Sequence, residues 1–131
     1  NKDKAMSEKL VVIVDDDSEM VQILSRRFAD LGCQVIGTNC ALDAMNAISK
    51  VVPAMVCLDV NMPGGNGWSV RELIASDERL SEVPVVMLTG CRDEQTIRRC
   101  HETMSYYVEK NTNVWQRIEP LANELLFATS A

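Results

Sequence analysis

The sequence is poor in aromatic residues, histidine and proline, and it lacks a long apolar run. Only 5% of its 131 residues are aromatic, one is histidine and four are proline. No apolar stretch approaches the ~20 residues that a membrane-spanning helix needs. The first residues, NKDKAMSEK, are too polar for a signal peptide. We therefore expect a cytoplasmic protein that does not bind a membrane.

Cysteine and histidine are too few and too scattered to predict a disulfide framework or a zinc site. The five cysteines are odd in number, and no two have CxxC spacing, so reduced thiols are the simplest expectation. The single histidine, His101, falls in a polar stretch, where a solvated side chain is more common than a metal ligand.

Positive charge is also in short supply. Lysine and arginine number 13 against 19 acidic residues, which gives a net charge of -6 and argues against direct nucleic-acid binding by this domain. Hydrophobic residues make up 47% of the chain, enough for the core of one globular domain. Such an acidic protein would repel a phosphate-bearing substrate unless a cation intervened.

Short apolar runs alternate with amphipathic stretches, which is typical of a repeated βα architecture. Leu10–Val14 is continuously apolar, as expected for a strand covered on both faces. The other predicted strands are 34–38, 55–58, 83–88 and 106–109, and the predicted helices are 18–31, 41–48, 68–75, 93–104 and 114–127. Five βα units predict an α/β fold, a doubly wound three-layer sandwich of the flavodoxin-like kind with parallel strand order 2-1-3-4-5.

Some local features refine this prediction. Gly32 is placed to end the first helix. The spacing of Leu42, Met45 and Ile48 predicts that these side chains point inward from the second helix, and Val70, Leu73 and Ile74 form the apolar spacing of the third. The segment 63–67, Pro-Gly-Gly-Asn-Gly, is expected to be a turn-rich connection.

Chemically competent side chains follow four of the five predicted strands. They are Asp15, Asp16 and Asp17 after the first strand, Asp59 and Asn61 after the third, Thr89 after the fourth and Lys110 after the fifth. Because the carboxyl ends of parallel strands share one edge of the sheet, we expect these groups to lie together. Asp17 or Ser18 also has an ordinary explanation as the N-cap of the next helix.

Clustered carboxylates would repel one another, so a cation is expected among them. Mg²⁺ prefers a few carboxylates, a carbonyl oxygen and waters, and it would also offset the repulsion of an incoming phosphoryl group. Lys110 could neutralise one phosphoryl oxygen, and the hydroxyl of Thr89 could donate a hydrogen bond to another. Asp59 is then the predicted nucleophile, as in aspartyl-phosphate chemistry.

This set of residues resembles the receiver domain of two-component response regulators. The motifs that carry the resemblance are VVIVDD (Val11 to Asp16), LDVNMP (Leu58 to Pro63), LTG (Leu88 to Gly90) and YVEK (Tyr107 to Lys110). Asp59 and Thr89 are 30 positions apart, the usual family spacing. The resemblance covers residues 8–129 and leaves 1–7 as an N-terminal tail.

The resemblance implies a role for each matched residue. Asp59 would be the phosphoacceptor, Asp16 a direct ligand of Mg²⁺ (or Mn²⁺), Asp15 a ligand acting partly through water, Asn61 a ligand through its backbone carbonyl, and Thr89 and Tyr107 the switch residues. The domain would be a phosphorylation-dependent signalling switch of a phosphorelay, not a turnover enzyme, that catalyses only its own phosphorylation and dephosphorylation. Its phosphodonor would be a sensor histidine kinase or a histidine phosphotransfer protein.

The chain departs from the family pattern near its C-terminal end. Asn111 follows Lys110 where the family has a cis proline, so this peptide bond is either strained or trans in a reshaped loop. The customary glycine before the fifth strand is missing, and Pro120 falls inside the last helix, where it should bend it or start a new turn. The affected face, formed by the fourth helix, fifth strand and last helix, commonly carries a homodimer contact or an output partner in the family.

Two alternatives remain open from the sequence. The unusual Lys110–Asn111 loop allows a constitutive interaction module of the same fold that is never phosphorylated. The Asp15-x-Asp17 pattern allows a phosphohydrolase of the haloacid-dehalogenase type, although such enzymes usually carry a cap domain and this chain is short for one.

Overall fold

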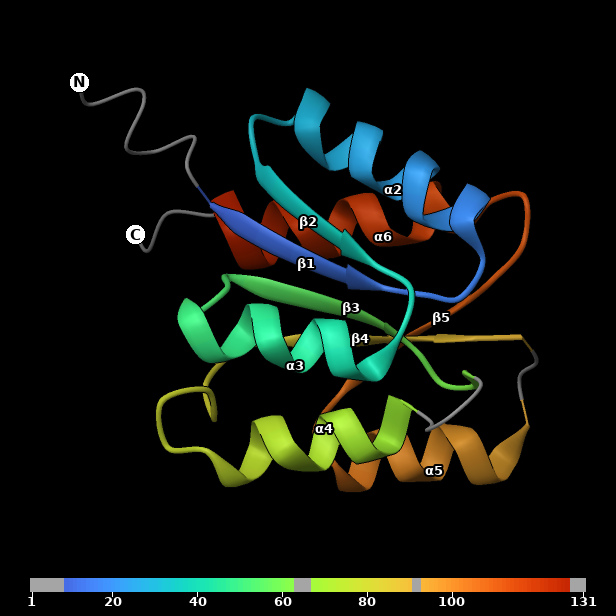
Figure 1. The fold of residues 1–131 in the computed structure, drawn as a ribbon. Helices are drawn as coiled ribbons and strands as arrows, with labels where there is room; N and C mark the ends of the chain where they lie inside the picture. Colours follow the sequence, from blue (N-terminus) through green and yellow to red (C-terminus); the bar gives the residue numbers. More distant parts are fainter. Residues whose placement is uncertain (1–8, 63–66, 91–92, 128–131) are drawn as a thin grey trace.

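The computed structural model describes residues 9–62, 67–90 and 93–127, and its centre is a five-stranded parallel sheet between two layers of helices (Figure 1). The strands are β1 (Leu10–Val14), β2 (Gln34–Thr38), β3 (Met55–Asp59), β4 (Val85–Thr89) and β5 (Tyr106–Glu109). Their order is β2-β1-β3-β4-β5, with every neighbouring pair parallel. The predicted doubly wound fold is therefore confirmed.

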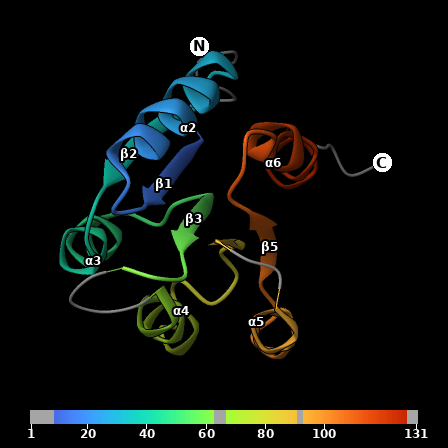
Figure 2. The ribbon, with the colours of Figure 1, turned by 90° about the vertical axis from the view of Figure 1, so that its right-hand side faces the viewer.

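In the described part of the chain, helices cover both faces of the sheet (Figures 1 and 2). The first layer contains α2 (Ser18–Asp30) and α6 (Val114–Ala122), and the second contains α3 (Ala41–Lys50), α4 (Gly67–Ser76) and α5 (Glu94–Glu102). Among the described residues, none of these helices is long and apolar enough to cross a membrane.

Each face of the sheet has its own hydrophobic core. Val11 and Ile13 of β1 pack with the core beneath α2 and α6, whereas Val12 and Val14 pack with the core beneath α3, α4 and α5. Successive side chains of a strand point to opposite faces, so a strand covered on both sides is apolar at every position. This geometry explains the continuous apolar run of β1.

The ends of α2 follow the predicted signals. The Asp17 carboxylate accepts hydrogen bonds from the backbone N–H groups of Glu19 and Met20, at 3.0 and 3.4 Å, and so caps the helix. After the helix, Gly32 adopts a positive φ of 94°, which glycine tolerates without steric cost. The residues at both ends of α2 therefore predict where this helix begins and ends.

Two predicted helix faces are wrong in part. On α3, Ile48 is buried and Met45 packs against the core as predicted, but Leu42 is 71% exposed and Ala44 is buried. On α4, Leu73 is half-exposed whereas Arg71 is buried. Apolar spacing alone identifies a helix better than it identifies which stripe of that helix faces the sheet.

Several predicted boundaries shift by a few residues. β4 begins at Val85 and not at residue 83, although the carbonyl of Pro84 already accepts a hydrogen bond from Val56. α4 begins at Gly67, which the prediction had placed in the preceding loop. The rest of that loop (63–66), the predicted tail (1–7) and the predicted last residues of the domain (128–129) lie outside the described residues.

The C-terminal departures take a definite form. Pro120 is accommodated inside α6, and the chain then continues as a π-helical turn, η1 (Asn123–Phe127). None of the described peptide bonds is cis, so the Lys110–Asn111 bond is trans. The side-chain oxygen of Asn111 accepts a hydrogen bond from the N–H of Asn113 at 2.8 Å, which organises the turn that leads into α6.

Candidate functional site

Three carboxylates meet at the carboxyl ends of two neighbouring strands. β1 and β3 pair with Val14 opposite Leu58, so the next residues, Asp15 and Asp59, lie side by side. Asp15 is fully buried and Asp59 is 3% exposed, whereas Asp16 is exposed. One oxygen from each of the three carboxylates lies within 4.8 Å of the other two.

Lys110 reaches this cluster from the end of β5, the strand at the edge of the sheet. Its backbone N–H donates to the carbonyl of Thr89 at 2.7 Å, which anchors the residue at the end of β5. Its Nζ lies 3.0 Å from both carboxylate oxygens of Asp15 and 3.4 Å from Oδ2 of Asp59. The contact with Oδ1 of Asp15 is a hydrogen bond, whereas Oδ2 is a buried atom that receives the ammonium's charge without hydrogen-bond geometry.

Backbone groups hold both buried carboxylates in place. The N–H of Asp17 donates to Oδ1 of Asp15 at 2.9 Å, and the N–H of Asn61 donates to Oδ1 of Asp59 at 3.2 Å. Each carboxylate therefore keeps one oxygen tied to its own loop. Such ties limit the rotation of the side chains and hold them in one arrangement.

The electrostatics of the cluster favour a bound cation. Burial raises the pKa of Asp59 from 3.8 to about 7, and the neighbouring charge of Asp15 adds to this shift, while Lys110 opposes it. Burial of Lys110 disfavours its charge, but the hydrogen bond and charge of Asp15, with the charge of Asp59, outweigh this and raise the pKa of Lys110. One ammonium thus compensates the acidic cluster only partly.

The donor set of the cluster fits a hard divalent cation. Three carboxylates with oxygen atoms within 4.8 Å of one another can share one ion. Mg²⁺ and Mn²⁺ both accept oxygen ligands of this kind, and cysteine and histidine are not part of the cluster. The predicted ligands Asp15, Asp16 and Asp59 are therefore placed together, with Asn61 two residues beyond the end of β3.

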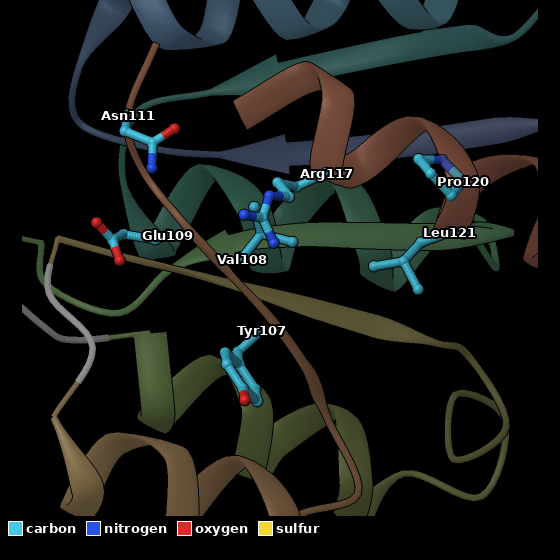
Figure 3. Close-up of a pocket in the computed structure, with 7 residues that line it drawn as sticks. All are labelled: Tyr107, Val108, Glu109, Asn111, Arg117, Pro120 and Leu121. Atoms are coloured by element: carbon cyan, nitrogen blue, oxygen red, sulfur yellow. The ribbon is translucent and has the colours of Figure 1, made fainter. Parts of the chain in front are cut away.

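Thr89 and Tyr107 lie on the neighbouring strands β4 and β5, two positions apart along the ladder. Thr89 ends β4 and is 3% exposed. Tyr107 pairs with Met87, two residues earlier on β4, and its ring lies 6.4 Å from that of His101 on α5. In Figure 3 the ring of Tyr107 extends from β5 toward the helices of the second layer, away from α6.

A groove of about 380 Å³ separates β5 from α6 (Figure 3). Its walls are formed by Tyr107, Val108, Glu109, Asn111, Arg117, Pro120 and Leu121. Arg117 extends from α6 toward β5 across this groove. The groove lies on the face for which the sequence predicted a dimer or output partner.

The sequence prediction overlooked two residues of α4. Gly67, the first residue of α4, donates its N–H to the carbonyl of Val60 at 2.9 Å, and a Cβ at this position would collide with the backbone carbonyl of Asp59. Its position eight residues after Asp59, directly before the predicted helix 68–75, was the available signal. Arg71 is buried among apolar residues of α4, and no pattern in the sequence marks it.

The fold of the chain is shared with chemotaxis and phytochrome response regulators. The Vibrio cholerae chemotaxis protein CheY4 superposes with a TM-score of 0.82 at 21% identity over 91% of this chain and 99% of that one. The phosphorylated cyanobacterial phytochrome response regulator RcpA gives a TM-score of 0.84 at 21% identity over 94% of this chain and 97% of that one. At these identities the likeness establishes the fold.

Curated relatives extend the likeness to the sequence. The transcriptional regulatory protein GltR of Pseudomonas aeruginosa is 32% identical over 84 residues, which are 64% of this chain and 35% of that protein. The polar-differentiation response regulator DivK of Brucella ovis is 26% identical over 122 residues, 89% of this chain and 96% of that one. The chain spans about a third of the length of GltR and of the similar ycf27 regulators.

The family model of the response regulator receiver domain matches residues 11–119. This range runs from β1 into α6 and contains the three carboxylates, Thr89, Tyr107 and Lys110. With the parallel sheet in receiver order and an acidic cluster at its carboxyl edge, the chain belongs to the receiver domains of two-component response regulators.

Proposed function

We propose that this domain is a signalling switch that accepts a phosphoryl group on Asp59 from a phosphohistidine, in the presence of Mg²⁺ or Mn²⁺. Receiver domains act as phosphorylation-dependent switches in two-component systems, and the family implies histidine kinases or phosphotransfer proteins as partners. The observation that carries the proposal is the buried Asp59 carboxylate held between an acidic pair and the Lys110 ammonium.

Each residue of the site has a proposed role that follows from its chemistry. Receiver domains generally bind a divalent metal, and here Asp15, Asp16, Asp59 and the carbonyl of Asn61 would hold it. When bound, the cation supplies positive charge that offsets the negative charge of the phosphoryl group. Two structural neighbours support this assignment, since one is the Mn(2+)-bound response regulator Rcp1 and another is phosphorylated RcpA.

The transfer itself needs one nucleophile and one leaving group. An oxygen of Asp59 attacks phosphorus as the P–N bond to the donor imidazole breaks, and the electron pair of that bond leaves with the imidazole. Lys110 stabilises an oxygen of the transferred group, and the hydroxyl of Thr89 donates to another. Water later cleaves the acyl phosphate, so the domain returns to its free form without turning over a separate substrate.

Lys110 reaches the cluster although its loop lacks the family's proline. The trans Lys110–Asn111 bond and the turn around Asn111 leave Nζ within 3.4 Å of both buried carboxylates. This geometry weakens the reason for expecting an interaction module that is never phosphorylated. The Asp17 side chain, in turn, caps α2. Of the two carboxylates in the Asp15-x-Asp17 pattern, only Asp15 is therefore left to serve a phosphohydrolase of the haloacid-dehalogenase type.

We assign the output or dimer contact to the face formed by α5, β5 and α6. The groove between β5 and α6 lies on this face beside Tyr107 (Figure 3). A change in the Tyr107 environment after phosphorylation would alter one wall of that groove. This proposal includes either kind of partner at that face, an output protein or a second copy of the chain.

One labelling experiment tests the proposal. A small acyl phosphate with Mg²⁺ should add one phosphoryl group to the wild type, measured by intact mass, and should leave Asp59→Asn unlabelled. Asp43→Asn, which removes an exposed carboxylate on α3, is the matched control and should label like the wild type. Equal labelling of wild type and Asp59→Asn would refute Asp59 as the acceptor.

A further inference from the structure

Arg71 is a buried cation on α4 without a carboxylate partner among the described residues. It is 7% exposed and is one of the buried residues of α4. Its Nε donates to Oγ of Ser105 at 2.7 Å, and its Nη2 donates to the carbonyl of Thr103 at 2.5 Å. Nη1 is a buried donor without a hydrogen-bond acceptor among the described residues.

Burial of an arginine at a core position costs stability. A buried guanidinium loses hydration, and here neutral acceptors replace only part of what water provides. Burial accordingly lowers the pKa of Arg71. A leucine or methionine would fill the same space without this cost, so stability alone does not account for an arginine at this position.

The acceptors of Arg71 lie at the junction between α5 and β5. Thr103 caps the C-terminal end of α5, and Ser105 precedes Tyr106, the first residue of β5. The N–H of Ser105 donates to the carbonyl of Cys100 at 2.8 Å, and its Oγ lies 2.9 Å from Oγ1 of Thr103. The guanidinium therefore holds the short segment that sets where β5 starts.

The same helix begins at the acceptor site. Gly67, its first residue, contacts the backbone of Asp59 so closely that a Cβ would not fit, and Arg71 follows one helical turn later. Further contacts tie α4 to α5, because Arg99 lies over the Trp68 ring at 4.6 Å and within 3.9 Å of Glu72. One rigid helix thus touches Asp59 at its start and the β5 junction through Arg71.

We propose that Arg71 is a positioning residue that couples the backbone around Asp59 to β5 and so to the Tyr107 side chain. This inference rests on the proposed function, because it concerns how phosphorylation at Asp59 reaches Tyr107. A displacement of the Asp59 loop moves the start of α4, and Arg71 carries this displacement to Ser105, two residues before Tyr107. The chemistry at Asp59 does not require Arg71, so coupling and phosphorylation are separable.

The test compares Arg71→Met with Arg71→Lys and with Arg79→Met. Arg79 also donates to a backbone carbonyl, that of Ile48, and its ion-pair partner is Asp77. Among the described residues it therefore has no bond to the β5 junction, and it is the matched control. Phosphoryl uptake is measured by intact mass, and the response of Tyr107 is measured as the NMR shift of its ring protons on phosphorylation. We expect normal uptake in all variants, a Tyr107 response at least threefold smaller in Arg71→Met, partial recovery in Arg71→Lys and a normal response in Arg79→Met.

Two further measurements keep the proposal falsifiable. If Arg71→Met does not fold, Ser105→Ala removes the Nε acceptor, together with the Oγ contact to Thr103, and should still reduce the Tyr107 response. Hydrogen exchange of the Ser105 amide in the unphosphorylated protein should be at least threefold faster in Arg71→Met than in the wild type. Because that readout needs no phosphoryl group, it tests the tether even if labelling of Asp59 fails. A full Tyr107 response in folded Arg71→Met, or unchanged exchange at Ser105, would overturn the inference.

Discussion

The Nζ atom of Lys110 lies 3.0 Å from both carboxylate oxygens of Asp15, a residue without any exposed surface. The ammonium therefore occupies the side of Asp15 that faces Asp59. A divalent cation that uses the same carboxylates must share them with this ammonium. In the proposed function, Lys110 would therefore tune metal affinity as well as serve a phosphoryl group.

Lys110→Met should tighten Mg²⁺ binding. It keeps a long unbranched side chain but removes a positive charge beside two acidic ligands, so we expect the Kd to fall roughly tenfold, corresponding to ~1.4 kcal/mol. The measurement is a Mg²⁺ titration by calorimetry at pH 8. Lys50→Met, which changes an exposed lysine at the end of α3, should leave the Kd unchanged. Weaker Mg²⁺ binding in Lys110→Met would show that the ammonium supports the metal site and does not compete with it.

The raised pKa of Asp59 makes stability depend on pH. Because the folded pKa is about 7 against 3.8 for an ordinary aspartate, the folded chain holds this proton more tightly than the unfolded chain. The contribution of Asp59 to stability is thus present in acid and is lost as the pH rises from about 4 to about 7. Asp59→Asn removes the titrating group and with it this loss.

Asp59→Asn should therefore be more stable than the wild type at pH 8, by on the order of 1–3 kcal/mol, with the difference shrinking toward pH 4. Urea unfolding in metal-free buffer across this range measures the free energy of unfolding. Glu82→Gln, at an exposed position, should follow the wild type. Added Mg²⁺ should stabilise the wild type more than Asp59→Asn, because a ligand that binds only the folded state stabilises it. A constant difference between pH 4 and pH 8 would contradict the raised pKa.

Gly67→Ala should disturb the acceptor loop. The added Cβ would collide with the backbone carbonyl of Asp59, so either α4 or this loop must move. We expect a loss of ~1–3 kcal/mol in the free energy of unfolding and slower phosphorylation by a small acyl phosphate. Gly90→Ala is the matched control, since a Cβ there meets no atom of the described residues within 4 Å, and its stability should change by less than ~0.5 kcal/mol. Equal stability of the two variants would mean that the start of α4 is not pressed against Asp59.

The fold could be predicted from the sequence because its signals are local and repeated. The apolar run of β1 and the N-cap Asp17 each depend on a few neighbouring residues, and the structure confirms both. The edge of the sheet that gathers Asp15 and Asp59 follows from topology alone, since parallel strands place their carboxyl ends together. These parts of the prediction needed no knowledge of packing.

The parts that failed depend on how separate elements pack. Leu42 is exposed because the orientation of α3 is decided by the sheet and by α4, not by its own periodicity. Arg71 is buried because Thr103 and Ser105, more than 30 residues away, provide its acceptors. A pattern rule that counts arginine as polar places this residue on the surface. Long-range pairing of this kind has no signature in a single sequence.

Met104 occupies the place where the family's glycine is missing, and it carries a positive φ of 56°. The N–H groups of Met104 and Ser105 donate to the carbonyls of His101 and Cys100, at 3.1 and 2.8 Å, so a left-handed residue closes the end of α5. A side chain in this conformation costs ~1–2 kcal/mol, and Met104 recovers little by packing, because it is 86% exposed.

Met104→Gly should therefore stabilise the protein. Relief of the strain exceeds the greater entropy that glycine gives the unfolded chain, ~0.5–1 kcal/mol, so we expect a net gain of about 0.5–1 kcal/mol in the free energy of unfolding. Met104→Ala keeps a Cβ and should gain less than ~0.5 kcal/mol, which separates backbone strain from the exposed apolar side chain. Guanidinium unfolding of the three proteins measures these differences. If Met104→Gly were no more stabilising than Met104→Ala, the backbone at the end of α5 would not be strained. In that case hydrogen bonds alone, without backbone strain, would characterise the junction that Arg71 holds.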